Sequence, residues 1–564
     1  MKLKKSIISI LLITVLCFTG CTKWSIPTNA NTAFRNFTLC LFQEEVSANT
    51  INLHYILEEP AKYGIVDFPI TFGSFDFNET ATLASIENIE AALHKFSPKS
   101  LSKSNRITYD ILVDYFQALR EGVAFHYYEE PLSPVTGVHA QLPVLLAEYQ
   151  FHNSSDVETY LSLLKTMPEY MNSLISFEQQ KAVKGLFMSD EVADEVISQC
   201  NAFINMGDKN YLLSTFEERL GSLYSLSSDT RVRLNETNRE IVFSYVIPAY
   251  ESLANAITAL KGSGTNEQGL CYFPDGKEYY FYLISSETGS SKTVSKLKEM
   301  IQGQILTDLQ DSQKVLLKNP TILEETDSIT ESPETILQTL KTKISAAFPS
   351  SADVNVRIKQ VPPALEATLS PAFYLIPTID NYNENTIYIN QGHSLTDMNL
   401  FTTLAHEGYP GHLYQTTYFA NTSPDPIRSL LDSPGYVEGW ATYAEMCSYY
   451  LSPLSKPHAT LLQKNNSLIL GLYALADIGI HYDGWTLDDT IKHFSSYGIG
   501  DESTIKDIYE YILGDPSNYL KYYVGYLEIL ELKKDCQLSQ KEFHKEMLEI
   551  GPAPFDVVRK YMTK

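Results

Sequence analysis

The sequence has few cysteines, and none of them lies at the spacing of a metal-binding or redox motif. Seven cysteines occur among 564 residues, and no C-x-x-C motif is present. Five of them follow Cys21, widely spaced and odd in number. This arrangement argues against a disulfide framework and against a metal ion held by cysteines. We expect these side chains to be buried as small hydrophobic residues.

Positive charge is also scarce. The chain has 43 Lys and Arg residues against 68 Asp and Glu residues, which gives a net charge of −25. A strongly acidic protein is repelled by the phosphate backbone of DNA and RNA. We therefore expect no nucleic-acid partner.

Long apolar runs are missing beyond the N-terminus. There, three lysines precede an apolar run over 6–16 that is too short for a membrane span. A small residue and Cys21 follow this run and resemble a bacterial lipobox, although Phe18 stands where Leu is usual. We predict a lipoprotein signal peptide over 1–20. Lipidation of Cys21 would hold the protein at the extracytoplasmic face of the cell membrane. An ordinary secretory signal or an uncleaved anchor is the alternative.

The remainder of the chain is rich in helical patterns. With 44% hydrophobic and 12% aromatic residues it is globular, and apolar residues recur at intervals of three and four over most of its length. Polar residues over 21–50 are typical of a tether. Alternating strand patterns gather within 352–391. The sequence predicts a mainly α protein with a small antiparallel β-sheet directly before the segment 403–415.

That segment, TLAHEGYPGHLYQ, contains the first candidate site. In the zinc motif H-E-x-x-H the two histidines lie four residues apart on one helix face. Here His406 and His412 lie six apart, so on a straight helix they would point about 120° away from each other. Pro410 would interrupt such a helix. Either the residues between Glu407 and His412 loop out and the site is real, or the match arises by chance.

A catalytic zinc site needs a third protein ligand. Glu438 lies 26 residues after His412 and shares one face of a predicted helix with Glu445. The alternative is that both carboxylates lie on a solvent-exposed face. The Gly-Trp-Ala sequence that follows Glu438 is not typical of a surface and favours the ligand interpretation.

A hydrolase also needs a donor for the negative charge that develops on the substrate oxygen. The tyrosines of segment 519–530, YLKYYVGYLEIL, and His481 in ADIGIHYDGW are candidates. Each has a structural alternative, since the chain contains 37 tyrosines and a single histidine often serves packing.

Four motifs in order, HEGYPGH, EGWATYAE, DIGIHYDGW and P-x5-YYVG, resemble the bacterial domain-of-unknown-function 885 family. The resemblance covers roughly residues 50 to 560. The family is similar to helical metallopeptidases of the neurolysin and angiotensin-converting-enzyme type. It therefore implies one large helical metallopeptidase-like domain over 51–564, with two lobes around a cleft.

The resemblance implies a Zn²⁺ ion held by His406, His412 and Glu438. Glu407 is then the general base that activates the zinc-bound water. One departure is Leu413, where many family members have a further histidine, so His412 alone remains as the second ligand.

The same resemblance implies that Tyr522 stabilises the transition state and that His481 contributes to catalysis. Tyr473 and Tyr511 stand where many members have arginine. Because an arginine there would suit a substrate carboxylate, its absence argues against release of C-terminal dipeptides.

Together these features predict a membrane-anchored zinc metallopeptidase that hydrolyses short peptides. Two other hypotheses stay open. The protein could bind peptides without cleaving them, although the helical pattern differs from the alternating strands and helices of two-lobed binding proteins. It could also be a zinc hydrolase of another amide or ester, since the same chemistry serves both.

Overall fold

The computed structural model describes residues 29–134, 136–326, 328–361, 366, 369–393 and 397–562. The predicted signal peptide and Cys21 lie outside the described residues. Among the helices of this part, none has the length and apolar character needed to cross a membrane.

Helices dominate the structure, which confirms the predicted mainly α class. The N-terminal helices are α2 (Ala30–Ser47), α3 (Thr50–Ile56), α4 (Glu79–Leu93), α5 (Lys103–Gly122), α6 (Val138–Glu148), α7 (Ser154–Leu164), α8 (Met167–Val183), α9 (Asp190–Asn205), α10 (Tyr211–Gly221), α11 (Ser228–Ile241) and α12 (Ile247–Leu260). The C-terminal helices are α13 (Gly276–Thr288), α14 (Val294–Lys318), α15 (Pro333–Lys343), α16 (Asp397–Glu407), α17 (His412–Ala420), α18 (Pro434–Ser448), α19 (Lys456–Ile478), α20 (Leu487–Ser495), α21 (Glu502–Gly514), α22 (Asn518–Asp535), α23 (Gln540–Ile550) and α24 (Phe555–Met562).

The first helix corrects the prediction of a tether over 21–50. Helix α2 begins at Ala30, where the side chain of Asn29 caps it by accepting the N–H of Asn31. Phe34 and Phe37 are buried on its inner face. The tether prediction is therefore wrong for residues 30–47, because polar residues on the outer face of the helix obscured the apolar residues spaced at helical intervals.

The sheet lies where it was predicted, but it is mixed and not antiparallel throughout. Its strands are β1 (Asn355–Gln360), β2 (Ala372–Leu375) and β3 (Glu384–Ile389), in the order β1-β3-β2. Strand β3 pairs antiparallel with β2 and parallel with β1. The antiparallel prediction is wrong for β1, since β1 and β3 run in the same direction.

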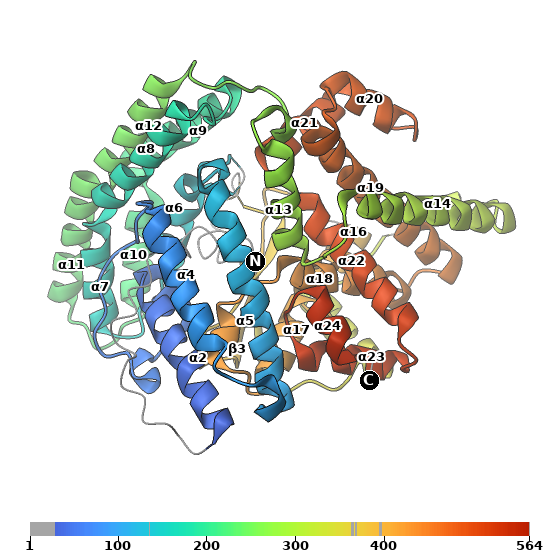
Figure 1. The fold of residues 1–564 in the computed structure, drawn as a ribbon, viewed down its shortest axis with the longest axis horizontal. Helices are drawn as coiled ribbons and strands as arrows, with labels where there is room; N and C mark the ends of the chain where they lie inside the picture. Colours follow the sequence, from blue (N-terminus) through green and yellow to red (C-terminus); the bar gives the residue numbers. More distant parts are fainter. Residues whose placement is uncertain are drawn as a thin grey trace.

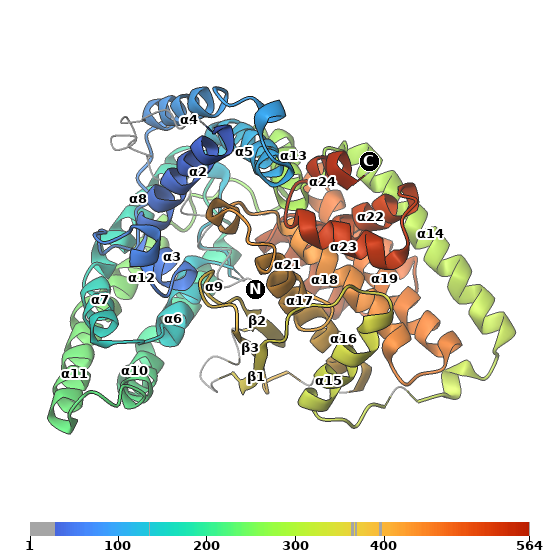
Figure 2. The ribbon, with the colours of Figure 1, turned by 90° about the horizontal axis from the view of Figure 1, so that it is seen from below.

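The sheet joins two hydrophobic cores. One core gathers side chains from α6 to α12, and the other gathers side chains from α2, α5 and the helices after α12. Successive residues of a strand point to opposite faces. Accordingly Phe373 and Tyr388 belong to the first core, while Tyr374 and Ile387 belong to the second. Figures 1 and 2 show the α6–α12 group on one side, α14 and α19 to α23 on the other, and the strands between them.

Candidate metal centre

The helix through the histidine motif is interrupted, as the sequence predicts. Helix α16 ends at Glu407 and α17 begins at His412, and residues 408–411 between them are not helical. The interruption changes the direction in which His412 points. Both histidines now face each other, with ring centroids 4.7 Å apart.

Close backbone packing holds the loop between the two helices. The N–H of Gly411 donates to the carbonyl of Ala405 at 2.9 Å. A Cβ atom at Gly411 would lie 1.8 Å from the carbonyl oxygen of His406, so only glycine fits there. On the other side, the indole Nε1–H of Trp440 donates to the carbonyl of Pro410 at 2.9 Å. The Gly and Trp of two motifs therefore fix one turn.

Three side-chain atoms form a compact triangle. The Nε2 atoms of His406 and His412 are 3.1 Å apart, and Glu438 Oε2 lies 3.6 Å from the first and 3.4 Å from the second. Two ligand atoms of a tetrahedral zinc site are about 3.3 Å apart. The triangle thus has the size of one face of such a site. Among the described His, Cys, Asp and Glu residues, no other group gathers in this way.

A second carboxylate orients the first histidine. The Nδ1–H of His406 donates to Glu445 Oε2 at 3.1 Å, and Asn466 Nδ2 donates to Glu445 Oε1 at 2.8 Å. The ring therefore presents its Nε2 lone pair to the triangle, as histidine ligands of metals usually do. Glu438 and Glu445 lie on one inward face of α18 (Pro434–Ser448), so the interpretation of a solvent-exposed face is wrong.

The histidines and carboxylates of the centre shift one another's pKa values. Burial alone would lower the pKa of His406, but its hydrogen bonds with Glu438 and Glu445 raise it to about 10. Burial lowers the pKa of His412. For Glu438, burial acts to raise the pKa, yet the adjacent His412 and His406 hold it well below its usual value. In the metal-free protein His406 is protonated and compensates part of the negative charge of Glu438 and Glu445, and a bound cation would replace that proton.

Glu407 lies beside the triangle and contacts the sheet. Its side chain is buried, and Oε2 accepts the backbone N–H of Tyr374 at 2.8 Å. Tyr374 belongs to β2, an edge strand of the sheet. The strand therefore fixes the orientation of the carboxylate that is predicted to act as general base.

Tyr522 reaches the centre from α22 (Asn518–Asp535). Its ring centroid lies 6.3 Å from that of His406. Burial and the negative charge of Glu438 raise its pKa well above the usual value of a tyrosine. The hydroxyl therefore keeps its proton and remains a hydrogen-bond donor.

Two glycines let α22 approach α18. A Cβ atom at Gly439 would lie 2.4 Å from the backbone of Gly525, and one at Gly525 would lie 2.0 Å from the carbonyl oxygen of Gly435. The two helices therefore touch through their backbones. This close approach brings Tyr522 to the face of α18 that carries Glu438.

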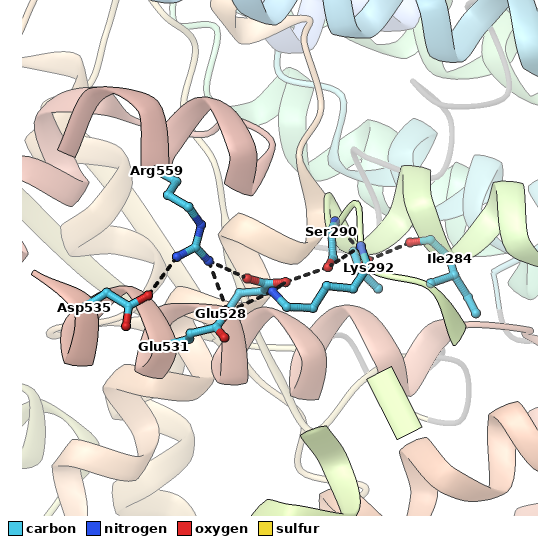
Figure 3. A network of polar contacts seen from close by, with 8 residues as sticks. Ile284, Ser290, Lys292, Glu528, Glu531, Asp535 and Arg559 are labelled. Atoms are coloured by element: carbon cyan, nitrogen blue, oxygen red, sulfur yellow. Dashed lines mark hydrogen bonds and ion pairs between the residues drawn. The ribbon is translucent and has the colours of Figure 1, made fainter. Parts of the chain in front are cut away.

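A network of charges holds the other half of α22. The buried carboxylate of Glu528 accepts from Ser290 and Lys292, both at 2.5 Å, and from Arg559 at 3.3 Å. Arg559 also contacts Glu531 and continues to Asp535, one turn further along α22 (Figure 3). The segment after α13 and helix α24 are thereby tied to the helix that carries Tyr522.

The structure gives His481 a structural position. It lies in a π-helical turn over Gly479–Asp483, where its Nδ1 accepts the N–H of Leu270 at 3.2 Å. Its Nε2 donates to the carbonyl of Ile512 at 2.9 Å. Burial lowers its pKa to about 4, so the ring is neutral. Since both ring nitrogens bond to the backbone, His481 joins three segments, and its predicted catalytic role has no support in this geometry.

Some residues of the site could not be predicted from the sequence. Asn466, which supports Glu445, lies on α19 with no motif around it, and Tyr374 contributes only a backbone N–H. The ring of Tyr519 lies 4.8 Å from that of Tyr473 and 5.8 Å from that of Tyr511. The two positions where arginine was expected are therefore part of an aromatic cluster.

Two solved structures share this fold. A "putative lipoprotein" from Colwellia psychrerythraea is similar over 95% of this chain and 98% of its own, with a TM-score of 0.81 and 18% identity. A second protein with that description, of unknown function and from Shewanella oneidensis, is similar over 95% and 99%, with a TM-score of 0.63 and 18% identity. None of the curated proteins matches the sequence. Residues 76–562 match the family described as "Bacterial protein of unknown function (DUF885)", and the chain belongs to that family.

Proposed function

We propose that the protein is a zinc-dependent hydrolase that cleaves short peptides. The observation that carries the proposal is the triangle of His406 Nε2, His412 Nε2 and Glu438 Oε2, with edges of 3.1 to 3.6 Å. A purely structural cluster has no need to turn three ligand atoms toward one point. The buried carboxylate of Glu407 beside it supports a catalytic and not merely structural metal site.

The donor set fits zinc. Two neutral imidazoles and one carboxylate are typical of catalytic zinc sites, which keep a fourth position open. The carboxylate of Glu445, which accepts from His406 Nδ1, and the burial of His412 and Glu438 suit the same ion. Bound there, Zn²⁺ would lower the pKa of a water molecule and polarise the substrate carbonyl.

The side chains around the triangle supply the remaining steps. Glu407 is oriented by the N–H of Tyr374 and takes a proton from the attacking water. It then delivers that proton to the leaving amine. Tyr522, which stays protonated, donates to the oxygen on which negative charge develops.

The size of the adjoining space supports short substrates. A cavity of about 750 Å³, with Glu438 in its wall, lies between the N-terminal helix α5 and the C-terminal helices α13, α18 and α22. Elements from both ends of the chain line it. An extended peptide of a few residues fits such a volume, whereas a folded protein does not.

The test combines metal content with cleavage. We expect the purified protein to bind one zinc ion and to cleave members of a peptide library, identified by mass spectrometry. Glu407→Gln should retain zinc but lose at least about 100-fold in rate. His412→Ala should lose both zinc and activity.

Each contrary result favours a different hypothesis. Peptide binding without cleavage in the zinc-loaded wild type would indicate a peptide-binding protein. Cleavage of esters or other amides but not peptides would indicate a different zinc hydrolase. Equal peptide cleavage by wild type and Glu407→Gln would refute the proposed role of that carboxylate.

We further propose that a lipid on Cys21 anchors the protein to the extracytoplasmic face of the membrane. The lipobox-like sequence before Cys21 and the description of both similar structures as lipoproteins support this. Metabolic labelling with a fatty acid should label the wild type but not Cys21→Ala. Release of the wild type from membranes by salt alone would contradict the anchor.

A further inference from the structure

The cavity beside the candidate metal centre has an unusual charge. Acidic residues enter its wall from several elements, and Lys521 is the only lysine or arginine among the described residues that line it. The whole chain, by contrast, has 43 Lys and Arg residues for 68 Asp and Glu residues. The lining therefore has a higher ratio of acidic to basic residues than the whole chain has.

The one cation is surrounded by carboxylates. Lys521 Nζ lies 3.7 Å from Glu287 Oε2, and its side chain is largely buried. Burial alone would lower the pKa of Lys521, but Glu287, Asp515 and Glu438 raise it well above its usual value. Since Glu438 belongs to the candidate metal centre, the ammonium faces Glu287 and Asp515. It cannot neutralise both of these carboxylates, so the cavity retains a net negative charge.

Two carboxylates in the wall form no salt bridge within the described part of the chain. Glu129 forms no side-chain hydrogen bond or salt bridge with the described residues, since Lys181 donates to its backbone carbonyl and pairs with the carboxylate of Glu130. Asp515 has a buried Oδ2 atom without a hydrogen-bond partner in the described part of the chain. Both side chains line the cavity.

A buried hydroxyl provides an independent indication of a ligand. Ser433 is 3% exposed, lines the cavity and precedes Glu438 by five residues. It stands at the N-cap of α18, yet its side chain does not cap the helix. Its Oγ has no hydrogen-bond partner within the described residues. A buried hydroxyl without a partner is costly unless a ligand or water meets it.

From this geometry we infer that the cavity binds the positively charged part of a peptide. The inference rests on the proposed function and adds the substrate class: short peptides with lysine or arginine side chains. Asp515 attracts the ammonium or guanidinium group, and Ser433 accepts one of its hydrogen bonds. Burial raises the pKa of Glu129 to about 8, and an adjacent cation would favour the charged form of its carboxylate. Peptides rich in Asp or Glu are repelled from the same wall.

The experiment compares three peptides of equal length that differ only in carrying Lys, Gln or Glu at the varied positions. Cleavage gives kcat/KM for each, and fluorescence anisotropy of labelled copies with the Glu407→Gln variant gives Kd. We expect the Lys peptide to exceed the Glu peptide by about tenfold in both quantities at low salt. Added salt should reduce the ratio.

Variants locate the effect in the cavity. Glu129→Gln and Asp515→Asn should each reduce the Lys-to-Glu ratio by about threefold. Glu324→Gln removes the same charge from an exposed residue outside the cavity and should leave the ratio unchanged. The two cavity variants are independent, so failure of one to fold leaves the other as a test.

The outcomes separate this inference from the proposed function. Cleavage of all three peptides at equal rates would overturn the inference and leave the hydrolase intact. Preferential binding of the Lys peptide without any cleavage would overturn the hydrolase and support the cavity as a cation site. Equal binding of the three peptides, or an equal loss of the ratio in Glu324→Gln, would overturn the inference.

Discussion

Glu445 Oε2 accepts a hydrogen bond from His406 Nδ1 at 3.1 Å. Glu445 lies seven residues after Glu438 on helix α18. One face of α18 therefore supplies both a candidate metal ligand and the group that orients another. Glu445→Gln removes the negative charge behind the ring. We expect zinc affinity to fall by about 10- to 100-fold, measured by competition with a chelator.

The matched control for this prediction is Glu251→Gln, which changes an exposed glutamate of α12. It should leave zinc affinity unchanged. If Glu445→Gln binds zinc as tightly as the wild type does, then Glu445 has no part in orienting the metal ligand.

The candidate site could be predicted from the sequence where side chains carry the chemistry. His406, His412 and Glu438 are recognisable because few residue types bind zinc and their helical spacing is informative. The Tyr374 N–H that holds Glu407 carries no side-chain signal. Histidine is a common metal ligand, yet both ring nitrogens of His481 form hydrogen bonds with the backbone of distant segments. Such partners follow only from the fold.

Apolar periodicity predicts the fold class. The predictions for the direction of strand β1 and for residues 30–47 differ from the structure. Strand β3 lies between β1 and β2 and runs parallel to β1, and short strands contain no signal for their order or direction. Polar composition predicts a tether over 21–50, although residues 30–47 form helix α2. The spacing of Phe34 and Phe37 within that stretch was the signal for helix α2.

Substitution of Gly525 tests the close packing of α18 and α22. Alanine there would place a Cβ atom 2.0 Å from the carbonyl oxygen of Gly435. The helices must separate, which moves Tyr522 away from His406, and overpacking costs about 1–3 kcal/mol. We expect Gly525→Ala to lower the free energy of unfolding in urea and to reduce activity.

Gly303→Ala is the control, because a Cβ atom at that position in α14 meets nothing within 4 Å. It should stabilise the protein by up to about 1 kcal/mol, since alanine favours helix more than glycine does. Equal effects of the two substitutions would refute the packing argument.

Glu528 tests the network that holds α22 (Figure 3). It is 1% exposed and bonds to Ser290, Lys292 and Arg559. Glu528→Ala leaves these partners without their acceptor, and breaking a buried pair costs about 3–5 kcal/mol. We expect that loss in the free energy of unfolding. Glu59→Ala, which breaks an exposed pair with Lys62, should change it by less than about 1 kcal/mol. A small effect of Glu528→Ala would show that the network contributes little.

The raised pKa of Asp477 makes the free energy of unfolding depend on pH. It is fully buried, its Oδ1 accepts from Tyr280 and from the N–H of Ser517, and burial raises its pKa to about 7. An unfolded aspartate has a pKa of about 3.9. The folded state therefore holds the proton more tightly, so this contribution to stability is fully present below pH 4 and is lost as the pH rises to about 7.

Asp477→Asn removes that dependence while the amide oxygen keeps both hydrogen bonds. Its Nδ2 atom would take the place of Oδ2, which has no partner among the described residues. Between pH 5 and pH 8 the wild type should lose up to about 3 kcal/mol of unfolding free energy relative to the variant. Urea denaturation of both proteins at the two pH values measures this difference, in which the other buried carboxylates cancel. A difference that is the same at pH 5 and pH 8 would show that Asp477 does not change its protonation in this range.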